Sequence, residues 1–152
     1  MTIEALRQKF TSKLPGEAAQ DRMSPQPKYV EGKEGIHQGL PINSAVMLLL
    51  IPHQGDLAIP FIKRTNVGKY HGGQIALPGG KTEPGDGNSL HTALRECEEE
   101  IGVTSKEVTV IGELSDVYIP LSNFNITPFV GTIPEMPNFV LSKNEVEKVI
   151  II

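Results

Sequence analysis

The chain of 152 residues contains no tryptophan and a single cysteine, Cys97. One cysteine excludes an intrachain disulfide and is typical of a reducing compartment, so we expect a cytoplasmic location. Strong charge is lacking too: a formal net charge of −4 provides no basic field for nucleic acid. The longest apolar run, residues 45–52, is too short to cross a bilayer, and no export signal follows Met1. We therefore expect neither nucleic acid nor membrane as a partner.

The remaining composition is that of an ordinary globular domain, with 39% hydrophobic and 21% charged residues. A chain of this length suits one domain with one core. Residues 1–43 are expected to form an N-terminal helix, from the apolar spacing over residues 3–10, and then an irregular arm over residues 15–43, rich in proline and glycine. Residues 44–152 are expected to form the main domain.

Short apolar runs separated by turn residues predict the strands of a sheet. The first two are joined as a hairpin by a turn at residues 53–56. A helix lies between the third and the fourth strands. This order predicts an α/β domain with a mixed sheet that is covered on its faces. The predicted strands span residues 46–51, 57–62, 74–77, 108–115, 126–131 and 145–152.

The most informative stretch, residues 79–103, passes from a glycine turn through an acidic loop into a helix crowded with carboxylates. With about 100° between successive helical residues, Glu96, Glu99 and Glu100 share one face. Cys97 belongs to a separate apolar stripe, so we expect a core residue rather than a nucleophile. Three like charges at this spacing repel one another. The arrangement favours a bound cation, and oxygen ligands indicate Mg²⁺ or Mn²⁺.

The same stretch resembles the signature box of the Nudix hydrolases. That box reads Gly, five residues, Glu, seven residues, then Arg-Glu-U-x-Glu-Glu-x-Gly-U, where U is a bulky apolar residue. Residues 95–103 fit the second half throughout, with Cys97 at an apolar position. Counted from Gly80, Asp86 stands where Glu is due and Arg95 comes one residue late. The resemblance implies that residues 44–152 form a Nudix domain, an α/β/α sandwich around a mixed sheet.

A second motif lies immediately upstream of the box. Arg64, Lys69 and Gly73 lead at regular intervals to residues 77–80, Leu-Pro-Gly-Gly. This pattern resembles the extra motif of the coenzyme A pyrophosphatase branch, with Lys69 in place of an arginine and Leu77 in place of a phenylalanine. That branch usually has the longer glycine-to-arginine spacing as well. The resemblance implies coenzyme A or its acyl derivatives as substrate, with 3′,5′-ADP and 4′-phosphopantetheine as products.

The resemblance also implies the metal ligands. Glu96 and Glu100 are expected as principal ligands, with Glu99 as a further ligand or as the group that positions water. A backbone carbonyl near Gly80 is expected to meet the metal. Arg95, one turn before Glu99, can pair with it and hold its carboxylate in place. The loop before the helix adds two carboxylates that are expected to bind a further metal directly or through water, Glu83 and Asp86.

Cationic residues beside the glycine turn are the expected substrate contacts. Lys63, Arg64 and Lys69 lie close enough in sequence to reach phosphate groups, and Gly79 is expected to lie against the substrate. Glu145 resembles a downstream glutamate that some relatives use as a general base. We therefore expect Glu99, Arg95 and Glu145 to take part in catalysis.

Two other functions stay open. The chain could hydrolyse another nucleoside diphosphate derivative, such as ADP-ribose, or nucleoside triphosphates. It could also be a nucleotide-sensing Nudix module without catalysis, although the intact residues 95–100 argue against this. The sequence leaves open whether the protein forms a homodimer. Relatives continue with a final helix after the last strand, so the resemblance implies a truncated chain or a tail beyond Ile152.

Overall fold

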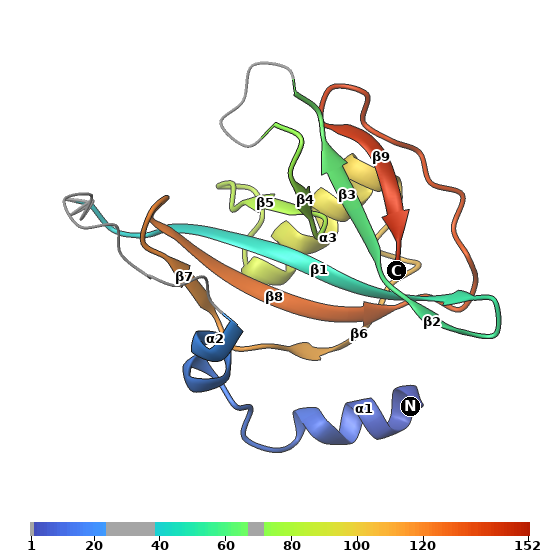
Figure 1. The fold of residues 1–152 in the computed structure, drawn as a ribbon, viewed down its shortest axis with the longest axis horizontal. Coiled ribbons are helices and arrows are strands. Elements are labelled where there is room, and N and C mark those ends of the chain that lie inside the picture. The colour runs from blue at the N-terminus through green and yellow to red at the C-terminus, as the bar shows by residue number, and fades with distance from the viewer. Residues whose placement is uncertain (1, 24–38, 67–71) are drawn as a thin grey trace.

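A computed structural model describes residues 2–23, 39–66 and 72–152 (Figure 1). The described residues form three helices: α1 (Ile3–Phe10), α2 (Glu17–Met23) and α3 (Ser89–Ile101). They also form nine strands: β1 (Ile42–His53), β2 (Asp56–Ala58), β3 (Pro60–Arg64), β4 (Ile75–Ala76), β5 (Gly79–Lys81), β6 (Thr109–Glu113), β7 (Val117–Ile119), β8 (Phe124–Thr132) and β9 (Val146–Ile151). Within these segments, no helix is both long and apolar enough to cross a membrane.

The strands form two sheets. In the larger sheet, the strand order is β2-β1-β8-β6, with β5 paired to β1 and β7 paired to β8. Strands β1 and β8 run parallel from the pair Ile42–Phe124 to the pair Leu50–Thr132, whereas the other pairings in this sheet are antiparallel. The smaller sheet is antiparallel, with the order β4-β3-β9. The predicted α/β fold with a mixed sheet is therefore confirmed.

Helix α3 covers one face of the larger sheet and forms the core with it. The fully buried residues on the sheet side include Met47 and Leu49 of β1, which belong to the same apolar cluster as Cys97 and Ile101 of α3. Burying a side chain of the size of leucine contributes roughly 1.5–3 kcal/mol. Cys97 is a core residue, as predicted, and burial raises the pKa of its thiol to about 12. This packing fixes which face of α3 remains for the carboxylates.

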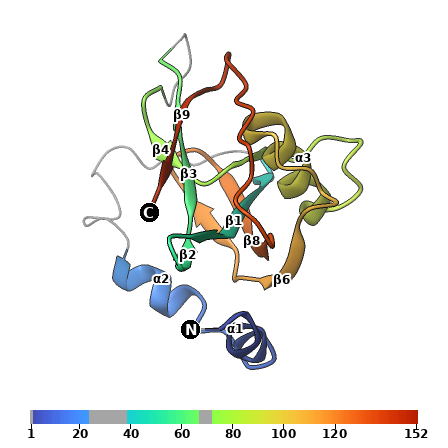
Figure 2. The ribbon, with the colours of Figure 1, turned by 90° about the vertical axis from the view of Figure 1, so that its right-hand side faces the viewer.

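Helix α1 lies at the other face of the larger sheet, and Figure 2 shows α1 and α2 across β1 and β8 from α3. The predicted helix over residues 3–10 is confirmed. Its Phe10 ring lies against the backbone of Gly112 in β6, where a Cβ atom would come within 2.3 Å of the ring. Leu6 and Phe10 line an apolar cavity of about 440 Å³ together with Leu48 and Leu50 of β1.

Two predictions about secondary structure were wrong. The first part of the expected irregular arm over residues 15–43 forms α2, which is anchored because the Gln20 side chain donates to the carbonyls of Ser115 and Asp116. Residues 24–38 of that arm lie outside the described residues. The expected single strand over residues 57–62 is divided into β2 and β3 at Pro60. Proline has no N–H to donate to a ladder, and here the chain leaves β1 and pairs with β9 in the smaller sheet. Short β5 and β7 were not predicted.

Candidate active site

Helix α3 begins and ends at well-formed caps, which set the positions of its carboxylates. The Asn88 side chain accepts a hydrogen bond from the His91 N–H at the N-terminus. Gly102 closes the C-terminus in the left-handed conformation, with φ 75°, and its N–H donates to the Glu98 carbonyl. Between these caps, Glu96 and Glu100 both come to lie against β5.

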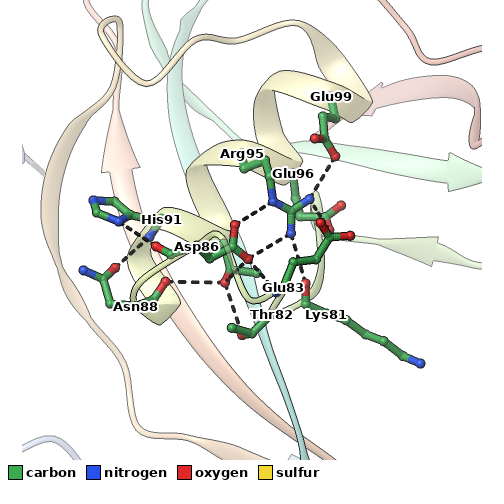
Figure 3. Close-up of polar contacts among 10 residues, drawn as sticks. Lys81, Thr82, Glu83, Asp86, Asn88, His91, Arg95, Glu96 and Glu99 are labelled. Atoms are coloured by element: carbon green, nitrogen blue, oxygen red, sulfur yellow. Dashed lines mark hydrogen bonds and ion pairs between the residues drawn. The ribbon is translucent and has the colours of Figure 1, made fainter.

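Asp86 anchors Arg95 to the loop before α3 (Figure 3). Arg95 Nε donates to one carboxylate oxygen of Asp86 at 2.7 Å, and Nη2 donates to the other at 3.1 Å. The second oxygen also accepts from the Thr92 hydroxyl and from the Glu83 N–H, each at 2.8 Å. The hydrogen bond from Arg95 holds the pKa of the buried Asp86 carboxyl well below its usual range, against the opposing effect of burial.

This arrangement gives Asp86 a different task from the one predicted. We expected Asp86 to bind a further metal, directly or through water. Its oxygens instead accept hydrogen bonds from three protein groups, which makes it a positioning residue for Arg95. Sequence reasoning missed Thr92 altogether, because a threonine inside a helix carries no signal of such a role. The signal for Asp86 was its place at the glutamate position of the box.

The other side of Arg95 holds two of the predicted ligands. Its Nη1 donates to Glu96 Oε1 and to Glu99 Oε2, each at 2.9 Å, and Nη2 also donates to the Lys81 carbonyl at 3.0 Å. The predicted pair between Arg95 and Glu99 is confirmed, and the contact with Glu96 adds to it. One guanidinium therefore connects the loop, β5 and the carboxylate face of α3, as Figure 3 shows.

Glu100 is buried, with 1% of its surface exposed. Its Oε2 accepts a hydrogen bond from the Gly79 N–H at 2.9 Å, whereas its Oε1 has no hydrogen-bond partner among the described residues. Arg64 Nη1 lies 3.6 Å from that oxygen, too far for a hydrogen bond. Burial raises the pKa of Glu100 to about 7, although the Gly79 N–H and Arg64 act in the opposite direction. A buried carboxylate oxygen without a donor is costly unless a cation meets it.

The two glycines of β5 permit two different close approaches. A Cβ atom at Gly80 would lie 2.3 Å from Glu96 Oε1, so Gly80 lets this carboxylate lie against β5, whereas one at Gly79 would lie 2.4 Å from the Ala45 carbonyl oxygen, so Gly79 lets β5 lie close to β1. Burial also raises the pKa of Glu96, with the hydrogen bond from Arg95 opposing it. Glu96, Glu100 and the backbone at Gly80 thus supply hard oxygen donors at one short strand, β5. This donor set fits Mg²⁺ or Mn²⁺.

The predicted metal ligands lie close together in the fold, but their carboxylates do not converge on a single metal position. Within residues 2–23, 39–66 and 72–152, no three acidic, histidine or cysteine side chains converge as a metal cage. The reason is visible in the contacts: Arg95 holds Glu96 and Glu99, while Glu100 turns toward Gly79. Their assignment as joint metal ligands stays a prediction.

The expected substrate contacts have different surroundings. Lys63 Nζ forms a cross-strand ion pair with Glu147 at 2.8 Å, and Arg64 faces Glu100. Lys69 lies outside the described residues. Glu145 precedes β9 and contributes to the negative potential that raises the pKa of both Glu96 and Glu100. The structure therefore brings Glu145 and Arg64 to the carboxylate face and pairs Lys63 with a residue of β9 in the smaller sheet.

Comparison with known proteins agrees with this architecture. The NUDIX domain family matches residues 41–135. A protein named uncharacterized Nudix hydrolase NudL, from Yersinia enterocolitica, is 35% identical over 102 residues, which are 67% of this chain and 52% of that protein. Nudix hydrolase 3 of Caenorhabditis elegans is 37% identical over 112 residues, 70% of this chain and 46% of that protein. The chain thus spans about half the length of the curated relatives it matches.

Solved structures share the fold. A C. elegans Ap4A hydrolase binary complex has a TM-score of 0.60 and 15% identity, covering 72% of this chain and 78% of that one. The Nudix hydrolase RenU of M. smegmatis has a TM-score of 0.61 and 20% identity, covering 75% and 71%. The NUDIX domain of Shewanella oneidensis NrtR, crystallised with ADP ribose, has a TM-score of 0.57 and 16% identity, covering 88% and 80%. Identities this low show the fold alone. With the family match over more than half of its length, the chain belongs to the Nudix family.

Proposed function

We propose that this protein hydrolyses a pyrophosphate bond in a nucleotide derivative, with Mg²⁺ or Mn²⁺ held by Glu96, Glu100 and the backbone at Gly80. The observation that carries this proposal is the buried Glu100 Oε1, which accepts no hydrogen bond within residues 2–23, 39–66 and 72–152. It lies on the carboxylate face of the box helix, beside a glycine strand that Glu96 also approaches. An oxygen in this position is stabilised by a cation.

The reaction needs charge neutralisation and a proton acceptor. When bound, the divalent ion neutralises phosphate oxygens and lowers the pKa of a coordinated water. Arg95 keeps Glu96 and Glu99 in place through its contacts with Asp86. Glu99, which is partly exposed, and Glu145 are the proposed groups for orienting water and accepting its proton. Water attacks one phosphorus of the P–O–P bridge and breaks its bond to the bridging oxygen, and the two products are phosphate monoesters.

For the substrate, we propose coenzyme A or an acyl derivative, which would give 3′,5′-ADP and 4′-phosphopantetheine or its acyl form. The motif from Arg64 through Gly73 to residues 77–80 supports this choice. A specific observation favours a second candidate without the 3′-phosphate, such as ADP-ribose. The two predicted cationic contacts that the structure describes already have acidic neighbours, since Lys63 pairs with Glu147 and Arg64 faces Glu100.

A substrate panel tests the proposal. Coenzyme A, dephospho-coenzyme A, ADP-ribose, diadenosine tetraphosphate and nucleoside triphosphates would be incubated with Mg²⁺ or Mn²⁺, and products separated by chromatography. We expect metal-dependent cleavage, fastest for coenzyme A. Rapid cleavage of ADP-ribose together with no cleavage of coenzyme A would favour the second candidate, a substrate without the 3′-phosphate. Nucleotide binding without cleavage of any compound would contradict the enzymatic proposal and favour a sensing module.

A further inference from the structure

A β-bulge aims the Arg64 side chain. Pairing between β3 and β9 shifts after Lys63, so that Lys63 lies opposite Lys148 and Arg64 lies opposite Val146. A bulge of this kind bends its strand and redirects a side chain. On its other side, the Arg64 backbone is held by Gln74, the residue before β4, because the Arg64 N–H donates to the Gln74 carbonyl at 2.9 Å. The direction of Arg64 is therefore built into the smaller sheet.

The bulge directs the Arg64 side chain toward Oε1 of Glu100. Arg64 Nη1 lies 3.6 Å from Glu100 Oε1, which receives no hydrogen bond from the part of the chain that the structure describes. Arg64 is 29% exposed at its side chain, whereas Glu100 is 1% exposed. The contact is thus electrostatic rather than a hydrogen bond. A flexible, partly exposed cation neutralises an atom that, under the function proposed above, is a metal ligand.

We propose that Arg64 is a metal-responsive substrate clamp. Without a divalent ion, its guanidinium stabilises the Glu100 carboxylate; with the ion bound, Arg64 turns to the phosphates of the substrate. Two cations at one carboxylate oxygen repel each other, and the repulsion is strong where Glu100 is shielded from water. Arg64 and the divalent ion therefore compete for Glu100. Linkage makes this competition reciprocal, so metal binding prepares Arg64 for substrate. The inference rests on Glu100 as a ligand.

The decisive measurement is the Mn²⁺ affinity without substrate, by calorimetry or by electron paramagnetic resonance of free Mn²⁺. In Arg64→Gln the competitor is absent, so we expect Mn²⁺ to bind about five- to tenfold more tightly, at the lower end of typical coupling. The kcat/KM of the same variant should fall. Arg64→Lys keeps the charge and should bind Mn²⁺ nearly as the wild type does. Lys148→Gln removes a charge from the same small sheet and should leave the affinity unchanged, because exposed charges are screened.

In Arg64→Gln, tighter Mn²⁺ binding together with a lower kcat/KM distinguishes the clamp from a purely structural role of Arg64. A folded Arg64→Gln variant whose Mn²⁺ affinity is unchanged or weaker would overturn the inference. Wild-type protein offers a second test without substitution, in which Mg²⁺ is titrated while the Nε–H resonance of Arg64 is followed by NMR. The resonance should shift with metal, and an unshifted resonance at saturating Mg²⁺ would also overturn it. If Mn²⁺ binds wild type and Glu100→Gln equally, the proposed ligand itself is wrong.

Discussion

Asn in place of Asp86 tests whether the loop anchor of Arg95 stabilises the fold. Asp86→Asn keeps the size of the side chain but removes the charge that receives two hydrogen bonds from Arg95. It also places an amide nitrogen near a donor, because Thr92 and the Glu83 N–H approach the same carboxylate. Breaking a buried ion pair by removing one partner costs about 3–5 kcal/mol. Arg95 keeps its ion pairs with Glu96 and Glu99 and is partly exposed. We therefore expect the free energy of unfolding to fall by about 2–3 kcal/mol.

The sign of the pH dependence follows from the lowered pKa of Asp86 in the folded state. Its unfolded pKa is about 3.9, so the stabilisation is fully present above that pH and is lost as pH falls through the lower folded pKa. The difference in the free energy of unfolding between wild type and Asp86→Asn should therefore reach its full size near neutral pH. The difference in the free energy of unfolding should narrow below about pH 4, because the Asp86 carboxyl of the unfolded wild-type chain then takes up a proton while the folded one stays ionised.

Urea unfolding followed by circular dichroism measures this gap at neutral and acidic pH. Asp56→Asn is the matched control: Asp56 is exposed, accepts a hydrogen bond from the Leu57 N–H, and should change stability by less than about 0.5 kcal/mol. A double-mutant cycle with Arg95→Gln should show that most of the loss belongs to the pair. Equal losses in Asp86→Asn and Asp56→Asn, or a gap that does not narrow in acid, would refute the reasoning.

Three shorter predictions concern α3 and β5. Glu100→Gln should lower kcat/KM about a hundredfold or more, because a ligand charge is lost from the transition state; Glu98→Gln, the same change elsewhere on α3, should keep wild-type turnover, and equal rates in both would exclude Glu100 from the site. Gly80→Ala should weaken Mn²⁺ binding about 10- to 100-fold, because its Cβ would lie 2.3 Å from Glu96 Oε1; calorimetry with unchanged affinity would contradict this. Cys97, with a pKa of about 12, should react with a thiol reagent far more slowly in the native protein than in urea; rapid native labelling would contradict its buried position.

Residue spacing alone was enough to predict the features that depend on the geometry of one or two helical turns. The apolar stripe of α3 predicted the burial of Cys97, and i, i+4 spacing predicted the pair between Arg95 and Glu99. The helix over residues 3–10 followed from spacing in the same way. These predictions succeeded because each depends on helix geometry alone, which is the same in any fold. The motif at residues 95–103 likewise indicated the family before any tertiary contact was known.

Tertiary structure decided what the polar side chains do. Sequence analysis grouped Lys63 and Arg64 as neighbouring phosphate contacts, but strand pairing gives Lys63 to Glu147 and the bulge after it turns Arg64 to Glu100. It also offered Asp86 as a metal group, whereas the folded loop gives it to Arg95. Successive residues of a strand point to opposite faces, and their partners depend on register with distant strands. That register is set by the packing of the whole domain, so no local pattern could reveal which carboxylates Lys63 and Arg64 would meet.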